Sequence, residues 1–426
     1  MDALTSGFVG TTIFLGFLIG TKRWPIFSKS RSPIPPGVRS VPLVEGGLPF
    51  IGHGIAFAID SIGFVRKCYA KYGKVFKIKI FRFSMILVCD RECAAEYFKA
   101  GEHKFSFVDI LTMLYFADAF SDVGIPVTRL QKLMHKTVAV RVDRFLPKIK
   151  VEAERCIARL EEQVQTFAGN REINFAKDMV RFVMSTSVMC FMGIELSDRA
   201  FENMYEFNQL VNTVVSSAYF LPPWLIRLIF GRRLASYRNR VLIEFEPEIE
   251  KYRADRGKNE SIILRATVDS FNELTGKPLT NREIGEILLC LLFVSSENTA
   301  TGLTLAIVNL VNHPEHWDRA RAESRKFLRN GDVKGIMTSE YLHACVMEMA
   351  RLNSHMFAIL RRPREKNVLG EFFVGEVDAV GMCVQMMQVH GSAEEVFSDP
   401  TTYKPDRFLG GVDGLGDKEP MGRKIL

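Results

Sequence analysis

Two motifs in the second half of the chain could together form a buried ion network. Glu348 and Arg351 are three residues apart, so their carboxylate and guanidinium share one face of a predicted helix. The same helix carries apolar side chains that favour burial: Val346, Met347, Met349 and Leu352. A buried ion pair needs further partners to offset its desolvation, and Arg407 in the segment 403–409 could complete a Glu-Arg-Arg network. Taken alone, each motif is more typical of an exposed ion pair.

A run of polar residues interrupts an otherwise apolar helix. We predict one helix from Asn281, which would cap it, to about Val311, roughly 45 Å long. Its middle, from Ile287 to Ala306, is apolar on nearly every face, as in a core helix. The exception is Ser295-Ser296-Glu297-Asn298-Thr299, which requires a chemical or structural reason. One structural alternative is that Ser295 and Asn298 bond the backbone of a kinked helix.

The cysteines argue against a disulfide framework and against zinc. They are scattered, mostly in apolar surroundings, and no C-x-x-C pair occurs: Cys68, Cys89, Cys93, Cys156, Cys190, Cys290, Cys345 and Cys383. This usage is typical of a reducing compartment with buried free thiols. Paired ligand spacings for a zinc site are absent.

Composition bounds the class of protein. The 426 residues are 47% hydrophobic and 25% charged, which is enough apolar material for a large core. The net charge of +7 includes no block of like charges, so nucleic acid is not implied. A mild basic excess favours solubility or attraction to anionic lipid.

Helical periodicity dominates the elements that must position these residues. An early β-hairpin is predicted from Val75–Ile80 and Ser84–Val88, with a short turn near Arg82. Strand signals nearly vanish from Arg91 to about Leu328 and return near residues 360–385. The fold is therefore predicted to be mainly α with a small β portion.

The N-terminus predicts a membrane anchor. No charged residue occurs from Ala3 to Gly20, and basic residues follow directly, which places the downstream body in the cytoplasm. A cleaved secretory signal fits less well, because the basic residues come after the apolar run. We predict an anchor over residues 1–21, a basic and Pro-rich hinge over 22–42 and one domain over 43–426.

The E-x-x-R helix followed by P-D-R-F resembles the cytochrome P-450 superfamily. The resemblance covers nearly the whole chain, from the anchor and hinge to the early hairpin, the long central helix and the Asn312-His313-Pro314-Glu315 junction. It implies the mainly-α prism of that superfamily. It also implies that Glu348, Arg351 and Arg407 form a structural network beside a haem.

The resemblance assigns a catalytic role to the polar run. The family places A-G-x-D-T-T over the haem, and here Glu297 matches the acid, Asn298 the usual threonine, and Thr299 follows. Glu297 and Thr299 would deliver protons, and Asn298 would orient oxygen or water. The amide is a departure, because it cannot pass a proton as a hydroxyl does. It resembles an Asn-Thr variant among sterol and bile-acid hydroxylases, which hints at a steroid- or terpenoid-like substrate.

The resemblance also suggests residues that bind the haem propionates. Arg361 or Arg362 lies at the family's offset for a propionate arginine, and either could point inward. Three more basic residues lie where the family usually has a W-x-x-x-R helix: Arg129, Lys132 and His135. A solvated basic face is an equally good interpretation of these three.

The family's axial cysteine motif, F-x-x-G-x-R-x-C-x-G, does not occur in the 426 residues, so no metal ligand is assigned. Three hypotheses follow: a sequence that lacks its end, a catalytically inactive relative, or a membrane protein that binds apolar ligands without haem. The expectation for the complete protein is a haem-dependent monooxygenase of an apolar small molecule, such as a terpenoid, a steroid or another secondary metabolite. Its electrons would come from NADPH through a membrane-bound cytochrome P-450 reductase, at the endoplasmic reticulum.

Overall fold

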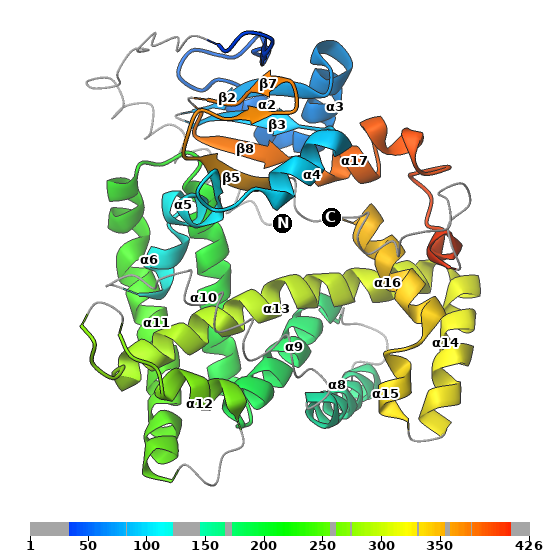
Figure 1. Cartoon of the computed structure of the whole chain (residues 1–426). Coiled ribbons are helices and arrows are strands. Elements are labelled where there is room, and N and C mark those ends of the chain that lie inside the picture. The colour runs from blue at the N-terminus through cyan, green and yellow to red at the C-terminus, as the bar shows by residue number, and fades with distance from the viewer. Residues whose placement is uncertain are drawn as a thin grey trace.

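The computed structural model of the chain describes residues 34–81, 83–121, 145–166, 173–255, 261–272, 275–329, 332–353, 358–375, 377–409. A helical body and a smaller β portion make up this part of the chain (Figure 1). In Figure 1 the strands lie above the long helix α13 (Asn281–Asn312), which crosses the molecule from α12 to α14. The predicted anchor over residues 1–21 lies outside the described residues.

The β portion consists of two sheets. The larger has the order β2-β3-β8-β5-β4, from β2 (Val75–Ile80), β3 (Phe83–Val88), β8 (Ala379–Met382), β5 (Ile359–Pro363) and β4 (Phe105–Ser106). Strands β2 and β3 form the antiparallel hairpin, and β3 pairs in parallel with β8. The smaller sheet has the order β1-β7-β6, from β1 (Arg39–Ser40), β7 (Phe372–Phe373) and β6 (Val368–Leu369).

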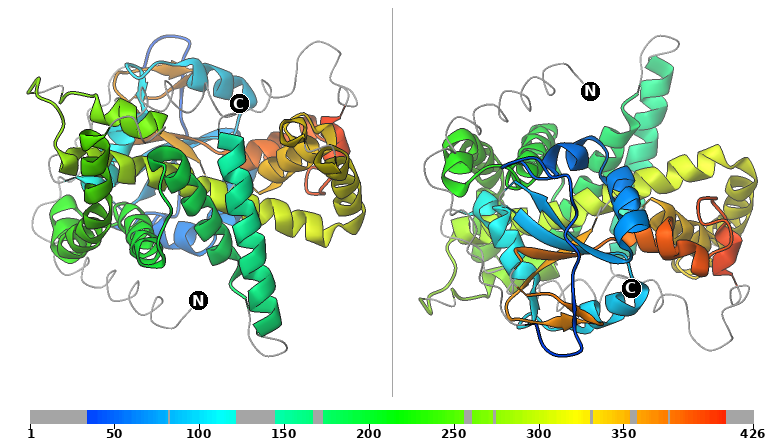
Figure 2. Two further views of the ribbon diagram at one scale, coloured as in Figure 1. Left: turned by 90° about the horizontal axis from the view of Figure 1, so that it is seen from below. Right: turned by 90° about the horizontal axis from the view of Figure 1, so that it is seen from above.

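The helices follow the hydrophobic periodicity of the sequence. Before the long helix come α2 (Gly54–Ile59), α3 (Ser61–Tyr72), α4 (Arg91–Lys99), α5 (Phe107–Met113), α6 (Phe116–Phe120), α8 (Leu146–Thr166), α9 (Phe175–Met192), α10 (Asp198–Ser217), α11 (Pro223–Ala254) and α12 (Ile262–Val268). After it come α14 (Pro314–Arg329), α15 (Val333–Ile336), α16 (Glu340–Leu352), α17 (Val384–Gln388), η2 (Gly391–Glu395) and η3 (Pro405–Phe408). Figure 2 shows α8 projecting from the body of the molecule.

The first half of α13 forms the centre of the main core. Ile284, Leu288 and Leu292 are fully buried there. Helix α13 packs against α9 and α11, so an apolar helix surface is removed from water on several sides. Among the described residues, α13 is the helix long and apolar enough to cross a membrane, and half of that stretch is buried in the protein. We therefore interpret it as a core helix.

The start of α13 differs from the prediction. The cap is Thr280, not Asn281: the Thr280 hydroxyl accepts from the Glu283 backbone N–H, and the Glu283 carboxylate accepts from the Thr280 backbone N–H. This reciprocal pair satisfies two donors that a helix start leaves free. Asn281 is already the first helical residue.

The predicted fold class is confirmed: the chain is mainly helical with small sheets. The hairpin and the later β region also occur where they were predicted. Two short strands were missed, because β1 and β4 have only two residues each and give no alternating pattern. Helix α11 continues through Pro247, where a break would be the usual expectation.

Candidate functional site

The second half of α13 has an open face. Val294 is 43% exposed, and Asn298 and Thr301 are also exposed, although the helix is buried from Ile284 to Phe293. These exposed positions recur at spacings of four and three residues, so they lie on one side of the helix. A methyl group added at Gly302 would have no described neighbour within 4 Å. The helix therefore offers a surface against which another group could lie.

Glu297 does not lie free at the centre of this helix. Its Oε1 accepts a hydrogen bond of 2.8 Å from Nδ2 of Asn208, and its Oε2 accepts one of 2.9 Å from Nδ2 of Asn212. Both asparagines belong to α10, so the carboxylate bridges the two helices. Sequence reasoning missed these partners. The available signal was a pair of amides four residues apart on a helix whose other inward residues are apolar.

Several hydroxyls in and just after the polar run bond back to the helix. The Ser296 hydroxyl donates to the Leu292 carbonyl at 2.7 Å, and the hydroxyl of Thr301, two residues after the run, donates to the Glu297 carbonyl at 3.0 Å. Ser295 likewise donates to the Leu292 carbonyl, as the structural alternative expected of it. Thr299 is exposed beside them, so its side chain is open to a bound group.

Aromatic rings cover the same region. Phe293 of α13 contacts Phe116 and Phe120 of α6, with ring centroids 5.6 and 5.3 Å apart. Phe120 also contacts Phe207 of α10 at 5.4 Å, mostly edge to face. The polar run thus adjoins an aromatic cluster to which α6, α10 and α13 contribute.

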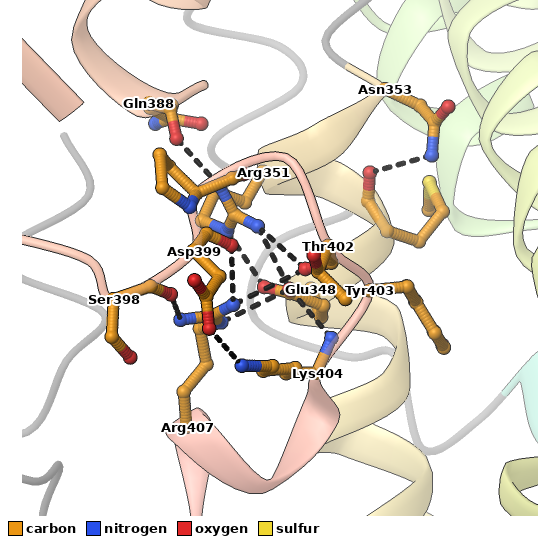
Figure 3. A network of polar contacts seen from close by, with 12 residues as sticks. Glu348, Arg351, Asn353, Gln388, Ser398, Asp399, Thr402, Tyr403, Lys404 and Arg407 are labelled. Atoms are coloured by element: carbon orange, nitrogen blue, oxygen red, sulfur yellow. Dashed lines mark hydrogen bonds and ion pairs between the residues drawn. The ribbon is translucent and has the colours of Figure 1, made fainter. Parts of the chain in front are cut away.

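The structure brings Glu348, Arg351 and Arg407 together (Figure 3). The Arg351 guanidinium binds both oxygens of Glu348, at 2.7 and 2.8 Å, and Nε of Arg407 binds Oε1 at 3.1 Å. The side chains of Glu348 and Arg351 are 0% exposed and that of Arg407 is 7% exposed. These motifs therefore do not form the exposed ion pair that either would suggest alone.

Backbone groups complete this network. Arg351 donates to carbonyls that sequence reasoning could not identify, because they come from loops without a motif: Gln388, Pro400 and Thr402. The Lys404 backbone N–H donates to Glu348 at 2.9 Å. The ring of Phe397 packs under both guanidiniums, at 4.9 Å from Arg351 and 5.9 Å from Arg407. Every charged group in the network is therefore hydrogen-bonded.

The two candidate propionate arginines lie differently. Arg361 is 9% exposed, and its guanidinium donates to the Tyr97 and Ala100 carbonyls at 2.7 and 2.8 Å, at the end of α4. It therefore caps a helix in this structure. Arg362, the next residue of β5, is exposed. Arg129, Lys132 and His135 lie outside the described residues.

The described residues fit the body of a haem but supply no axial thiolate. The open face of α13 leaves room for a flat group, with Val294 as its apolar residue and Asn298, Thr299 and Thr301 as its polar ones. The thiolate ligand that the family resemblance implies would have to be accessible to the iron. All eight cysteines are buried, and burial raises the pKa of Cys290, the cysteine on α13, so that it remains a thiol. The described part of the chain could thus cover one face of the cofactor, and its buried cysteines do not offer an axial thiolate.

Comparisons with known proteins agree with the cytochrome P-450 resemblance of the sequence. A family model described as "Cytochrome P450" matches residues 42–416. The probable lanosterol 14-alpha demethylase of Acanthamoeba polyphaga mimivirus is 38% identical over 386 residues, which cover 90% of this chain and 54% of the viral protein. The lanosterol 14-alpha demethylase of Homo sapiens is 23% identical over 397 residues, covering 90% of this chain and 75% of the human protein. The chain thus spans about half the length of the viral relative.

A solved structure shares the fold. The retinoic-acid-bound cyanobacterial CYP120A1 superposes with a TM-score of 0.68 at 19% identity, over 87% of this chain and 82% of that one. At this identity the likeness concerns the fold alone.

Proposed function

Because the chain belongs to the cytochrome P450 family, we propose that the complete protein is a haem-dependent monooxygenase of a sterol. The observation that carries this proposal is the open, polar centre of α13 beside an aromatic cluster. A haem bound against this face would supply the activation of O₂. The residues of the chain would then bind the substrate, exclude water and supply protons.

Three residues of α13 would serve the reacting centre. Glu297 would supply a proton, since a carboxyl group beside a dry pocket is a suitable general acid. The exposed hydroxyl of Thr299 would pass a proton from solvent or from Glu297. Asn298 would orient a water molecule through its amide. Glu348, Arg351 and Arg407 would hold the core beside the cofactor.

A sterol is the substrate class that the similarities favour. The viral and human relatives are named as lanosterol 14-alpha demethylases, the viral one as a probable one. The partly exposed ring of Phe116 offers an apolar surface for a rigid polycyclic molecule, and the buried rings of Phe120, Phe207 and Phe293 pack behind it. Other apolar molecules, such as terpenoids, would use the same surfaces.

The proposal includes a membrane and an electron donor. The apolar run from Ala3 to Gly20 would anchor the protein in the endoplasmic reticulum with its body in the cytosol. Electrons would come from NADPH through a membrane-bound reductase. A sterol that dissolves in the bilayer would then be available beside the enzyme.

The test uses the product of the complete natural gene, expressed with haem in membranes and supplied with lanosterol, NADPH and cytochrome P450 reductase. We expect a haem spectrum that shifts on adding lanosterol, and oxidised sterol detected by mass spectrometry. In a Gly302→Leu variant, the new side chain would fill the open face, so haem or sterol binding should fall about tenfold or more while the protein stays folded.

The other outcomes separate the alternatives. Sterol binding without haem would favour the apolar-ligand-binding protein, and haem without sterol oxidation would favour an inactive relative. Absence of both haem and sterol binding in a folded protein would overturn the proposal.

A further inference from the structure

The side of α10 that faces α13 carries two asparagines one helical turn apart, Asn208 and Asn212. Each directs its Nδ2 at a different oxygen of Glu297, at 2.8 and 2.9 Å. A carboxylate that accepts two separate donors loses most of its rotational freedom. The contact therefore determines where this acid lies.

The donor of each pair can be assigned from chemistry. In both pairs the amide nitrogen donates and a carboxylate oxygen of Glu297 accepts, since an amide nitrogen cannot accept. This leaves Oδ1 of Asn208 enclosed and without a hydrogen-bond partner among the described residues. A buried acceptor without a hydrogen-bond partner is unfavourable. The Asn208 side chain donates to Glu297 although its own Oδ1 has no partner among the described residues.

The bridge joins parts of the molecule that differ in exposure. Asn208 is 1% exposed, whereas Asn212 is exposed at the surface. The inner bond thus fixes Glu297 to the core side of α10, and the outer bond extends toward solvent. A displacement of α10 would change both bonds, because they come from successive turns of one helix.

We propose that Asn208 and Asn212 are positioning residues for Glu297. They orient its carboxylate toward α10. The position of the proton donor therefore depends on the position of that helix. The inference rests on the proposed function, because it gives Glu297 the proton-donating role. The competing explanation is a bridge that only stabilises the packing of α10.

The first variants alter the outer donor in the haem-containing, full-length protein. Asn212→Ala removes one donor, and Asn212→Asp replaces it with a carboxylate that repels Glu297. When the Glu297 carboxyl group is displaced, proton delivery becomes slower. A larger share of the O₂ consumed should then be reduced to hydrogen peroxide. We expect a rise in peroxide per O₂ of about threefold for Asn212→Ala and about tenfold for Asn212→Asp, with a changed pH profile.

Gln209→Ala is the matched control. Gln209 is an exposed amide on the same helix, and the structure shows no contact of its side chain with Glu297. Its removal should leave the peroxide yield and the pH profile as they are. A change as large as that of Asn212→Ala would overturn the proposal.

A double variant separates positioning from stabilisation. When Asn212→Asp is combined with Glu297→Gln, the new amide can donate to the carboxylate introduced at position 212 and accept from Asn208. The bridge is then restored without an acid on α13. We expect resistance to denaturant to recover while the peroxide yield stays high. Recovery of both would mean that the bridge is only structural.

A measurement without haem makes the two proposals distinguishable. A double-mutant cycle of Asn212→Ala and Glu297→Gln should leave a coupling of about threefold or more in the unfolding equilibrium constant. If the coupling is present but no sterol is oxidised by the wild type, the proposed function fails and the bridge remains. If the coupling is absent, the positioning proposal fails by itself.

Discussion

At the scale of single residues, the best-defined feature is the environment of Glu348. Its carboxylate accepts from Arg351, from Arg407 and from the Lys404 backbone, and none of its surface reaches solvent. Burial of three charged groups costs free energy that only this complete set of partners offsets. The network is therefore sensitive to the loss of any one member.

Glu348→Gln should be strongly destabilising. It removes the negative charge that two buried guanidiniums share, and we expect a loss of about 3–5 kcal/mol, measured by denaturant unfolding. Arg39→Ala is the control, because the Arg39–Glu371 pair is largely exposed and its loss should change little. Equal effects of the two variants would contradict the structural role of the network.

The two neighbouring arginines of β5 should respond differently to removal. Arg361→Ala removes two donors from the Tyr97 and Ala100 carbonyls, so we expect a loss of about 2–3 kcal/mol in the cofactor-free protein. Arg362→Ala should have little effect on stability, because this side chain is exposed. An unchanged stability of Arg361→Ala with a lower haem content would instead favour the propionate role.

The sequence predicted some of these residues well and others not at all. The i,i+3 spacing of Glu348 and Arg351 and the P-D-R-F segment predicted a contact that the structure contains. The contact of Glu297 with α10 could not be predicted, because Glu297 and Asn208 are 89 residues apart and the asparagine belongs to no motif. The carbonyls that bind Arg361 were equally hidden, since any residue provides a backbone carbonyl.

At the scale of elements, an ion pair ties α5 to the segment after β5. The Arg364 guanidinium binds both oxygens of the Asp109 carboxylate, at 2.8 and 2.9 Å. Hydrogen bonding to Arg364 holds the pKa of Asp109 below its usual value of 3.8. A carboxyl group with a lowered pKa stabilises the fold above its usual pKa, and this contribution is lost as the pH falls.

Asp109→Asn should therefore lower stability at pH 7 but have a smaller effect in acid. We expect the unfolding midpoints of the wild type and the variant to converge as the pH falls below about 4, where the wild-type carboxyl group also becomes neutral. The measurement is denaturant unfolding at a series of pH values. A constant difference across the series would show that charge does not cause the effect.

Element boundaries were less predictable than element types. Thr280 rather than Asn281 caps α13, and the Thr-x-x-Glu spacing of Thr280 and Glu283 was the sequence signal for this capping box. Pro247 does not break α11, although proline usually disrupts a helix interior. Phe245 and Ile249, on either side of the proline, are buried in the core.

At the scale of the whole molecule, the mainly-α fold with a small β portion was predictable from periodicity. The arrangement of its helices and strands in space was not. Strand pairing between β3 and β8 leaves no local pattern, because the partners are far apart in the sequence. The family resemblance supplied the arrangement instead. The membrane anchor and the basic residues Arg129, Lys132 and His135 lie outside the described residues and stay predictions.

Thiol reactivity provides a test of the whole core. Burial raises the pKa of Cys68 and Cys190 to about 11 and that of Cys93 to about 12. All eight cysteines are buried. After one hour with iodoacetamide at pH 8, the native protein should therefore be labelled at less than about one thiol per molecule. The unfolded chain should react at all eight, as counted by mass spectrometry. Rapid labelling of several native thiols would contradict this packing.

The parallel pairing of β3 with β8 affects how the protein folds during synthesis. Ser84 of β3 hydrogen-bonds to the Asp378 carboxylate, 294 residues later in the chain. At about 5–20 residues per second, a ribosome needs roughly 15–60 s to make that interval. During this time the edge of β3 that pairs with β8 has no partner strand, so the nascent chain depends on protection from aggregation until most of it has been synthesised.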